Sequence, residues 1–230
     1  MNLKDLRPAH DWAIQYGIKS VIYGPPGSGK TPIINTAPRP LLLACEPGLL
    51  SMRGSQVPTF QAHTADKIDE FFEWFEKSNE RKNFDTLAID STSQMAEIYL
   101  QAALTGKSKS GNKMHGLAAY GEMAASTLKQ LNMVYFTQNI NTYLIAKEEI
   151  LDDNGLKFKR PWYQGKQLPV DVPHKYDLIL RLAQHNVPGV GQTRAFRCIG
   201  SLEEMARDRT GQLAEFEEPH FGKLVEKAMK

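Results

Sequence analysis

Cysteine is scarce in this sequence, and long apolar runs are missing from it. The 230 residues include only two cysteines, Cys45 and Cys198, which are too few for a disulfide framework or for a zinc site of their own. No segment approaches the ~18 apolar residues that a membrane-spanning helix requires, and the first residues lack the apolar core of a signal peptide. We therefore expect a soluble protein that stays in the cytoplasm and makes no contact with a membrane.

The chain also lacks a strong excess of charge of either sign. Its formal net charge is +2, so the sum alone does not indicate a nucleic-acid-binding protein. Two segments, 105–115 and 157–166, nevertheless carry lysine or arginine without any acidic residue. Local patches of this kind matter more than the sum for binding a polyanion. Their cations are Lys107, Lys109, Lys113, Lys157, Lys159, Arg160 and Lys166.

Alternating strand-like and helix-like segments predict an α/β fold with a mainly parallel sheet. Continuous apolar runs at 41–45 and 86–90 are typical of strands buried on both faces. Strands are expected at 17–23, 41–45, 59–62, 86–90 and 141–146, and helices at 66–77, 93–104 and 116–138. An antiparallel extension is suggested by a hairpin at 150–159 and by strands at 177–182 and 193–199. We expect a single domain over 1–230, with a core of about 17–200 and a C-terminal tail of about 212–230.

A glycine-rich loop follows the first expected strand. Gly24, Gly29, Lys30 and Thr31 satisfy the pattern G-x-x-x-x-G-K-[ST], with a strand before it and a helix after it. Glycines let backbone N–H groups approach phosphates without a Cβ in the way, and the N-terminus of the following helix adds partial positive charge. Lys30 would reach the β- and γ-phosphates of ATP, and the Thr31 hydroxyl would bind Mg²⁺. The residues expected at the nucleotide are Gly24, Pro25, Pro26, Gly27, Ser28, Gly29, Lys30, Thr31 and Pro32.

A proline directly after this loop complicates the prediction. Pro32 follows Thr31, and a residue before proline is pushed away from helical angles, although proline itself is tolerated in a first helical turn. We expect a strained or slightly displaced helix start and an intact site. The alternative is a glycine-rich turn that matches the pattern by chance.

Two carboxylates end buried strands and complete the expected site. Asp90 follows 86–89, and ligands of a parallel sheet sit beyond the carboxyl ends of its strands, so Asp90 would hold the metal ion. Glu46 follows 41–45 and would take the proton from a water that attacks the γ-phosphate. As alternatives, Asp90 caps the helix that begins near Ser93, and Glu46 is a surface residue at a turn.

The order of these segments resembles the RecA-type ATPase core. The run Leu43-Ala44-Cys45-Glu46-Pro47-Gly48 is similar to that family's catalytic-glutamate segment, and Leu87-Ala88-Ile89-Asp90-Ser91 to its Walker B strand. The segment 141–146 looks like the next core strand. RecA places a glutamine sensor after that strand, whereas this chain has Lys147, Glu148 and Glu149 there, so it departs from the RecA pattern at this position.

More narrowly, the chain resembles the short phage ATPases of the Sak type, which are minimal RecA-like single-strand annealing proteins. Residues 146–149, the basic hairpin and the motif at 206–211 are reminiscent of that group, with Arg207 where lysine is expected. The resemblance implies a phage-encoded ATPase that binds single-stranded DNA and promotes annealing or strand exchange in the cytoplasm of the host cell. It also implies a homo-oligomer, as a ring or filament, and a single-strand-binding protein as a partner.

The resemblance places the first DNA loop at 105–115 and the second at 150–167. In the second, Lys157, Lys159 and Arg160 alternate with Phe158, Trp162 and Tyr163, and such a mixture of cations and rings suits single strands. Lysine-rich loops that are merely solvated are the alternative, for Lys107, Lys109 and Lys113 as well.

Arg207 and Arg209 are candidates for cations that reach the γ-phosphate of a neighbouring subunit, or else they belong to a surface helix end paired with Asp208 and Glu204. Two other functions stay open on the same core. One is a helicase-like or motor accessory ATPase, and the other is a nucleotide-gated assembly factor with little turnover.

Overall fold

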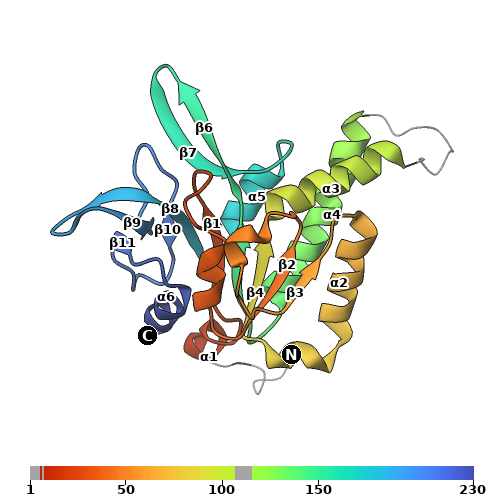
Figure 1. Cartoon of the computed structure of the whole chain (residues 1–230), viewed down its shortest axis with the longest axis horizontal. Helices are drawn as coiled ribbons and strands as arrows, with labels where there is room; N and C mark the ends of the chain where they lie inside the picture. Colours follow the sequence, from red (N-terminus) through yellow and green to blue (C-terminus); the bar gives the residue numbers. More distant parts are fainter. Residues whose placement is uncertain (1–5, 7, 107–115) are drawn as a thin grey trace.

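The computed structural model describes residue 6 and residues 8–106 and 116–230. A central sheet lies between helices on its two faces, and a long hairpin projects from this body (Figure 1). The strands are β1 (Lys19–Tyr23), β2 (Pro40–Ala44), β3 (Thr59–Gln61), β4 (Thr86–Asp90), β5 (Asn141–Ile145), β6 (Lys147–Asp153), β7 (Leu156–Trp162), β8 (Leu178–Val187), β9 (Gly191–Arg197), β10 (Arg207–Asp208) and β11 (Phe216–Glu217). The helices are α1 (Ala9–Ala13), α2 (Ala65–Lys77), α3 (Thr92–Thr105), α4 (Gly116–Phe136), α5 (Leu168–Lys175) and α6 (Phe221–Ala228), with short 3₁₀ turns η2 (Pro32–Thr36), η3 (Leu49–Met52) and η4 (Asn79–Asn83).

Nine strands of the described residues form one sheet. Its order is β11-β9-β8-β1-β5-β4-β2-β3, with β10 also paired to β8. The strands from β3 to β8 in this order run parallel, whereas β9, β10 and β11 are antiparallel additions. The prediction of an α/β fold with a mainly parallel sheet and an antiparallel C-terminal extension is confirmed.

The direction of β8 differs in detail from the expectation for 177–182. It pairs parallel with β1 and is antiparallel only toward β9 and β10. Helix α5 precedes it, and a crossover of this kind returns the chain in the same direction as before. The sequence did not indicate α5, because Pro169 and Pro173 interrupt its helical pattern.

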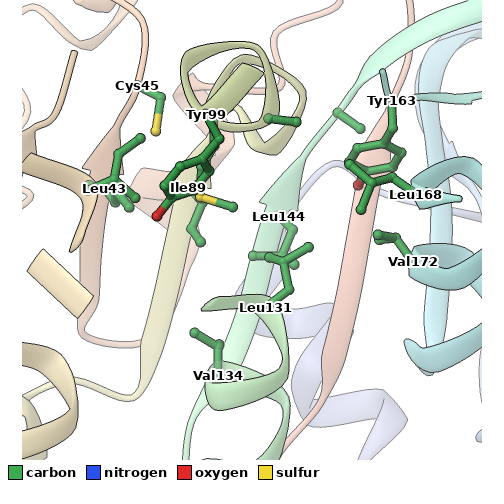
Figure 2. Packing of buried hydrophobic residues seen from close by; sticks show 14 of the residues in the cluster. Leu43, Cys45, Ile89, Tyr99, Leu131, Val134, Leu144, Tyr163, Leu168 and Val172 are labelled. Carbon is green, nitrogen blue, oxygen red and sulfur yellow. The ribbon is translucent and has the colours of Figure 1, made fainter. Parts of the chain in front are cut away.

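The core strands are buried on both faces because alternate side chains enter two separate clusters. Figure 2 shows one face, where Leu43, Ile89 and Leu144 lie beneath Tyr99 of α3 and Leu131 of α4. On the other face, strand residues such as Ile22 and Leu42 pack with residues of η2 and α6. Burial of each such aliphatic side chain stabilises the fold by about 1.5–3 kcal/mol. The sheet is thereby held between two layers, and its strand ends stay fixed.

Residues near the C-terminus belong to the same body. Strand β11 extends the sheet beyond β9, and α6 buries Phe221 and Leu224 in the second cluster. Among the described residues, no helix combines the length and the apolar character that a membrane span requires.

The hairpin of β6 and β7 forms a small sheet of its own. It turns at Asn154 and Gly155, which both have positive φ, 53° and 89°, as a two-residue hairpin turn requires. This confirms the expected turn. The hairpin starts directly after β5, so it leaves the sheet at the edge where the parallel strands end.

Candidate functional site

The loop of residues 24–31 joins β1 to η2 and depends on two of its glycines. A Cβ built on Gly24 would lie 2.1 Å from the Leu182 carbonyl oxygen, and one on Gly29 would lie 2.5 Å from an Arg194 guanidinium nitrogen. Gly29 also has a φ of 86°, an angle that residues with a side chain rarely adopt. The loop therefore needs glycine at position 24 because the backbone of Leu182 lies close, and at position 29 because of its positive φ.

The helix expected after the loop is only the short 3₁₀ turn η2. Thr31 takes helical angles (φ −63°, ψ −49°) although Pro32 follows it. Five residues carry little of the aligned dipole that a long helix would supply. The expected contribution of a helix N-terminus to anion binding is therefore small here, and the positive charge of the site comes mainly from Lys30 and backbone N–H groups.

Lys30 folds back over its own loop. Its Nζ donates to the carbonyl oxygens of Gly24 (2.8 Å) and Pro25 (3.0 Å). Burial lowers the pKa of Lys30, and the nearby carboxylate of Asp90 opposes that shift. The Lys30 carbonyl in turn accepts a hydrogen bond of 2.9 Å from the buried Tyr143 hydroxyl. The ammonium is thus held in place beside the loop before any phosphate arrives.

The two strand-end carboxylates lie beside each other and beside the loop. The register pairs Asp90 with Ala44 on β2, so Glu46 follows close by. Asp90 Oδ2 accepts a hydrogen bond of 2.6 Å from Thr31 Oγ1, and Glu46 Oε1 accepts one of 2.5 Å from Ser91 Oγ. Burial raises the pKa of Asp90, and Glu46 raises it further, whereas the Thr31 hydrogen bond lowers it.

Loop and carboxylates share a cavity of about 430 Å³. It is lined by Gly24, Pro26, Lys30, Thr31, Glu46, Gly48, Asp90, Ser91, Ile145, Ala146, Lys147 and Glu148. The structure therefore brings together the lysine, the hydroxyl and both carboxylates that the sequence indicated. Of the other expected contacts, Pro25, Gly27, Ser28, Gly29 and Pro32 belong to the same loop or follow it directly.

The residues present fit a hard divalent cation such as Mg²⁺. Thr31 Oγ1 and Asp90 Oδ2 are adjacent oxygen atoms of the type that Mg²⁺ prefers. Ser28 Oγ is buried in the loop and has no hydrogen-bond partner among the described residues. A buried hydroxyl of this kind is costly unless a ligand completes it. The loop is therefore shaped for a polar occupant.

The position after β5 holds a charged network instead of a glutamine. Lys147 Nζ donates to Glu97 Oε1 (2.9 Å) and Gln94 Oε1 (3.1 Å). Glu148 accepts from Arg181 Nε (2.7 Å), and Arg181 also donates to Glu204 Oε1 (2.9 Å). No local pattern in the sequence indicates this network, because its members come from distant segments. Arg194 beside Gly29 was missed for the same reason.

Arg207 and Arg209 donate to carbonyl oxygens at the end of α5. Arg207 Nη2 bonds to the carbonyl oxygens of Pro173 and Tyr176, and Arg209 Nη1 bonds to that of Lys175 at 2.9 Å. Through β8, Arg207 lies level with Val21 in the middle of β1 and Arg209 lies near the start of β1, so neither is at the end of β1 where the loop begins. Within one chain they therefore satisfy helix carbonyls, and their action on a neighbouring subunit stays a prediction.

The basic strand of the hairpin faces an acidic one, which the charge of residues 157–166 alone does not reveal. Lys159 Nζ lies 3.4 Å from Glu204, and Arg160 Nε lies 2.7 Å from Glu149. Lys157 is exposed, opposite Asp152. Lys107, Lys109 and Lys113 lie outside the described residues.

The aromatic residues at the end of the hairpin differ in how far their rings are exposed for stacking on a base. Tyr163 is buried, with its hydroxyl 3.1 Å from Thr92 Oγ1, so it is not free to stack on a base as expected. Trp162 is partly exposed and lies beneath Lys147 Nζ.

A direct link joins the hairpin to the strand before the loop. The Tyr23 hydroxyl, at the end of β1, donates to the carbonyl oxygens of Met205 (2.6 Å) and Lys159 (3.1 Å). Lys159 belongs to β7. Hydrogen bonds therefore join the end of the strand before the loop directly to the middle of hairpin strand β7.

Comparisons with known proteins match most of this chain to one family model. A family model described as an AAA domain matches residues 16–210, which include the loop, Glu46 and Asp90. No curated protein sequence matches the chain.

Three solved structures are similar to the chain at low sequence identity. One is a KaiC-like protein from Pyrococcus horikoshii (12% identity, TM-score 0.43, covering 80% of this chain and 81% of that one). Another is the flagellar accessory protein FlaH from Methanocaldococcus jannaschii (9% identity, TM-score 0.41, 80% and 78% covered). A third is an ATPase from the type III secretion system of pathogenic bacteria (13% identity, TM-score 0.45, 85% and 59% covered).

Proposed function

This chain belongs to the AAA domain family, and on that basis we propose that it hydrolyses ATP in response to single-stranded DNA bound at hairpin β6–β7, in a reaction that anneals or exchanges strands. Its fold is that of a RecA-like P-loop NTPase with a mostly parallel sheet. The observation that carries the ATPase assignment is the cavity in which Lys30, Asp90 and Glu46 meet. An anion-binding loop faces two carboxylates there, which suits a triphosphate with its metal ion.

Each residue of this cavity has a distinct role in the proposed hydrolysis. Lys30 neutralises the β- and γ-phosphates, and Thr31 and Asp90 would hold Mg²⁺, which supplies further charge neutralisation at the phosphates. Glu46 accepts a proton from water as the water oxygen bonds to the γ-phosphorus. The bond between that phosphorus and the bridging oxygen of ADP breaks, so the products are ADP and phosphate.

Coupling to DNA is supported by the link between Tyr23 and the hairpin. The same tyrosine ends β1 directly before the phosphate loop and donates a hydrogen bond to the Lys159 carbonyl of β7.

A groove of about 670 Å³ near the start of α4 offers a further surface for DNA. It includes the half-exposed ring of Tyr120 and the cation Lys166. Rings stack on bases and cations follow the backbone of single strands. Lys157 on the hairpin adds an exposed cation.

The deciding experiment is ATP hydrolysis measured with and without single-stranded DNA over a salt series. We expect stimulation by DNA that weakens as salt rises, because cations released from the strand drive the binding. Replacing Lys157, Lys159 and Arg160 together by alanine should weaken DNA binding. The plot of the logarithm of the binding constant against the logarithm of the salt concentration should also become less steep, by about 0.7 for each phosphate that is no longer neutralised. Lys77→Ala, on α2 and exposed, is a control for removal of a surface lysine. Unchanged DNA binding in the triple variant would contradict the assignment of the hairpin.

The hairpin also favours a second candidate function, a nucleotide-gated assembly factor. Three apolar side chains on it, Ile150, Leu151 and Leu156, are 56%, 38% and 51% exposed, which suits a protein partner better than a polyanion. Glu46→Gln separates the candidates. An ATPase loses turnover and keeps ATP binding, whereas a pure switch keeps its function. A motor accessory, the remaining alternative, would show directional unwinding.

A further inference from the structure

Arg194 of β9 lies against the phosphate loop of its own chain. Its guanidinium nitrogen Nη1 occupies the space next to Gly29, where a Cβ would come within 2.5 Å of it. The side chain is exposed, and it forms no hydrogen bond or ion pair with any residue that the structure describes. An arginine with free donors beside an anion-binding loop has the chemistry for a phosphate contact.

The strand pairing explains how this arginine reaches the loop. Strand β8 runs on past the end of β1, since Arg181 already pairs with Tyr23, and β9 follows it with Arg194 opposite Gln184. Phe196, two residues along β9 and on the same face, packs in the cluster that contains residues of η2. Arg194 therefore points to the side of the sheet where the loop and η2 lie.

A second observation agrees with a position of its charge near the loop. The positive charge of Arg194 acts on the Tyr143 hydroxyl and opposes the rise that burial causes in the pKa of Tyr143. That hydroxyl donates to the Lys30 carbonyl. Arg194 is thus close enough to influence the floor of the loop from the β9 side.

The sheet order determines which end of a nucleotide Arg194 would meet. Asp90 and Glu46 follow β4 and β2, on one side of β1, whereas β8 and β9 lie on the other side (Figure 1). The γ-phosphate and the metal ion belong with the carboxylates, because hydrolysis takes place there. The α-phosphate and the nucleoside consequently extend away from them, toward β8 and β9.

We propose that Arg194 binds the α- and β-phosphates, which ATP and ADP share, and acts in cis as a nucleotide-holding residue; this inference rests on the proposed ATP site. Its planar donors match phosphate oxygens. A contact made equally in the ground state and the transition state raises affinity and leaves the chemical step unchanged. Arg194 therefore retains ADP as well as ATP, and it is distinct from an arginine that stabilises the γ-phosphate.

The test compares the affinities of Arg194 variants for two nucleotides. Calorimetric titration with Mg-ADP and with a non-hydrolysable Mg-ATP analogue is made on the wild type, Arg194→Ala and Arg194→Lys, and kcat is measured at saturating ATP. For Arg194→Ala we expect both dissociation constants to rise by a similar factor of about tenfold or more, with kcat unchanged. Arg194→Lys, which keeps the charge and loses the planar fork, should lie in between.

Two controls isolate the effect of Arg194. Gln192→Ala alters an exposed residue on the same strand and face, and Lys77→Ala removes one positive charge on the distant α2. Both should bind nucleotides like the wild type. Weakening of the ATP analogue alone, a lower kcat with unchanged ADP affinity, or no change in either affinity would each overturn the inference.

Lys30→Ala separates failure of this inference from failure of the ATP site. If Lys30→Ala abolishes binding and Arg194→Ala leaves it intact, the ATP site stands and the role of Arg194 is wrong. If the wild type binds neither nucleotide, the proposed function fails and the inference fails with it.

Discussion

Ser91 Oγ donates a hydrogen bond of 2.5 Å to Glu46 Oε1, so the residue directly after β4 orients the proposed catalytic base, which follows the neighbouring strand β2. The same oxygen accepts from the Gln94 backbone N–H and caps α3. One hydroxyl thereby fixes both the start of a helix and the direction of a carboxylate. The position of Glu46 depends on this hydrogen bond, because the residue follows β2 at a turn.

Replacing Ser91 by alanine should lower kcat more than it changes KM. Without the donor, Glu46 is free to turn away from the attacking water, and a displacement of about 1 Å reduces rates by roughly 100-fold. Steady-state ATP hydrolysis measures both constants. Ser91→Thr keeps the hydroxyl and the cap and should retain most activity. Equal loss in both variants would indicate that the hydroxyl does not orient Glu46.

Asp90→Asn should abolish hydrolysis and remove the contribution of Mg²⁺ to ATP binding. The amide keeps the shape of Asp90 and its proximity to Thr31, but it lacks the charge that a divalent cation requires. Titration of ATP with Mg²⁺ and with EDTA measures this directly. We expect the difference between the two conditions to shrink from the wild type to the variant, with binding in EDTA retained. A variant that still gains affinity from Mg²⁺ would place the metal elsewhere.

On the acid side of the pH–rate profile (the acid limb), ATP hydrolysis should be lost at a pH above the ordinary pKa of an aspartate. Burial and Glu46 raise the pKa of Asp90, so its carboxyl takes up a proton at a higher pH than the unperturbed value of 3.8. The protonated form binds metal poorly, and activity should fall as the pH falls through that raised pKa. Raising the Mg²⁺ concentration should shift the limb to lower pH, because metal and proton compete. A limb that does not respond to Mg²⁺ would assign it to another group.

The parts of the site that the sequence revealed are local in the chain. Lys30 and Thr31 follow one strand, Asp90 ends a second, and Glu46 lies two residues after a third. A parallel sheet puts the carboxyl ends of its strands at one edge, so the sequence alone predicts that the residues after these strands share that edge. The fold class followed in the same way, from short apolar runs that alternate with amphipathic helices.

The parts that the sequence concealed depend on long-range pairing. Arg194 reaches the loop only because β8 and β9 add to the edge of β1, and nothing near Arg194 in the sequence indicates a phosphate. In the hairpin, long-range pairing changes how much of the charge is exposed. Residues 157–166 are basic when taken alone, but β6 places Glu149 against Arg160, and pairing of this kind removes part of the charge available to a polyanion.

Arg209→Ala should destabilise the fold modestly, whatever its role in an assembly. Its guanidinium donates to carbonyl oxygens at the end of α5, including that of Lys175, and removal of such bonds costs about 1 kcal/mol. Thermal unfolding measures this cost. Activity of wild type mixed with Arg209→Ala then tests the predicted action on a neighbouring subunit. A decrease in activity larger than the fraction of variant added supports that action. A decrease in proportion to the fraction of variant would limit the role of Arg209 to its hydrogen bonds with α5.

The free energy of unfolding should depend on Lys19 in a way that changes with pH. Lys19 is 1% exposed, and its Nζ donates to the carbonyl oxygens of Val134 (3.2 Å), Thr137 (3.0 Å) and Ile140 (2.7 Å), which lie in the last turn of α4 and directly after it. Lys19→Met leaves these oxygens without their donor, and we expect a decrease of at least ~2 kcal/mol near neutral pH. Denaturant unfolding of both proteins measures this difference.

Burial lowers the pKa of Lys19 to about 7 in the folded protein, from 10.5 in an exposed chain. Between these two values the unfolded state binds the proton that the folded state has released, so the stability of the wild type rises with pH. Lys19→Met has no such group. The difference in unfolding free energy between the two proteins should therefore grow as the pH increases above 7, by at most ~1.4 kcal/mol per pH unit. A difference that stays constant or shrinks would mean that the three carbonyl oxygens keep Lys19 charged in spite of its burial.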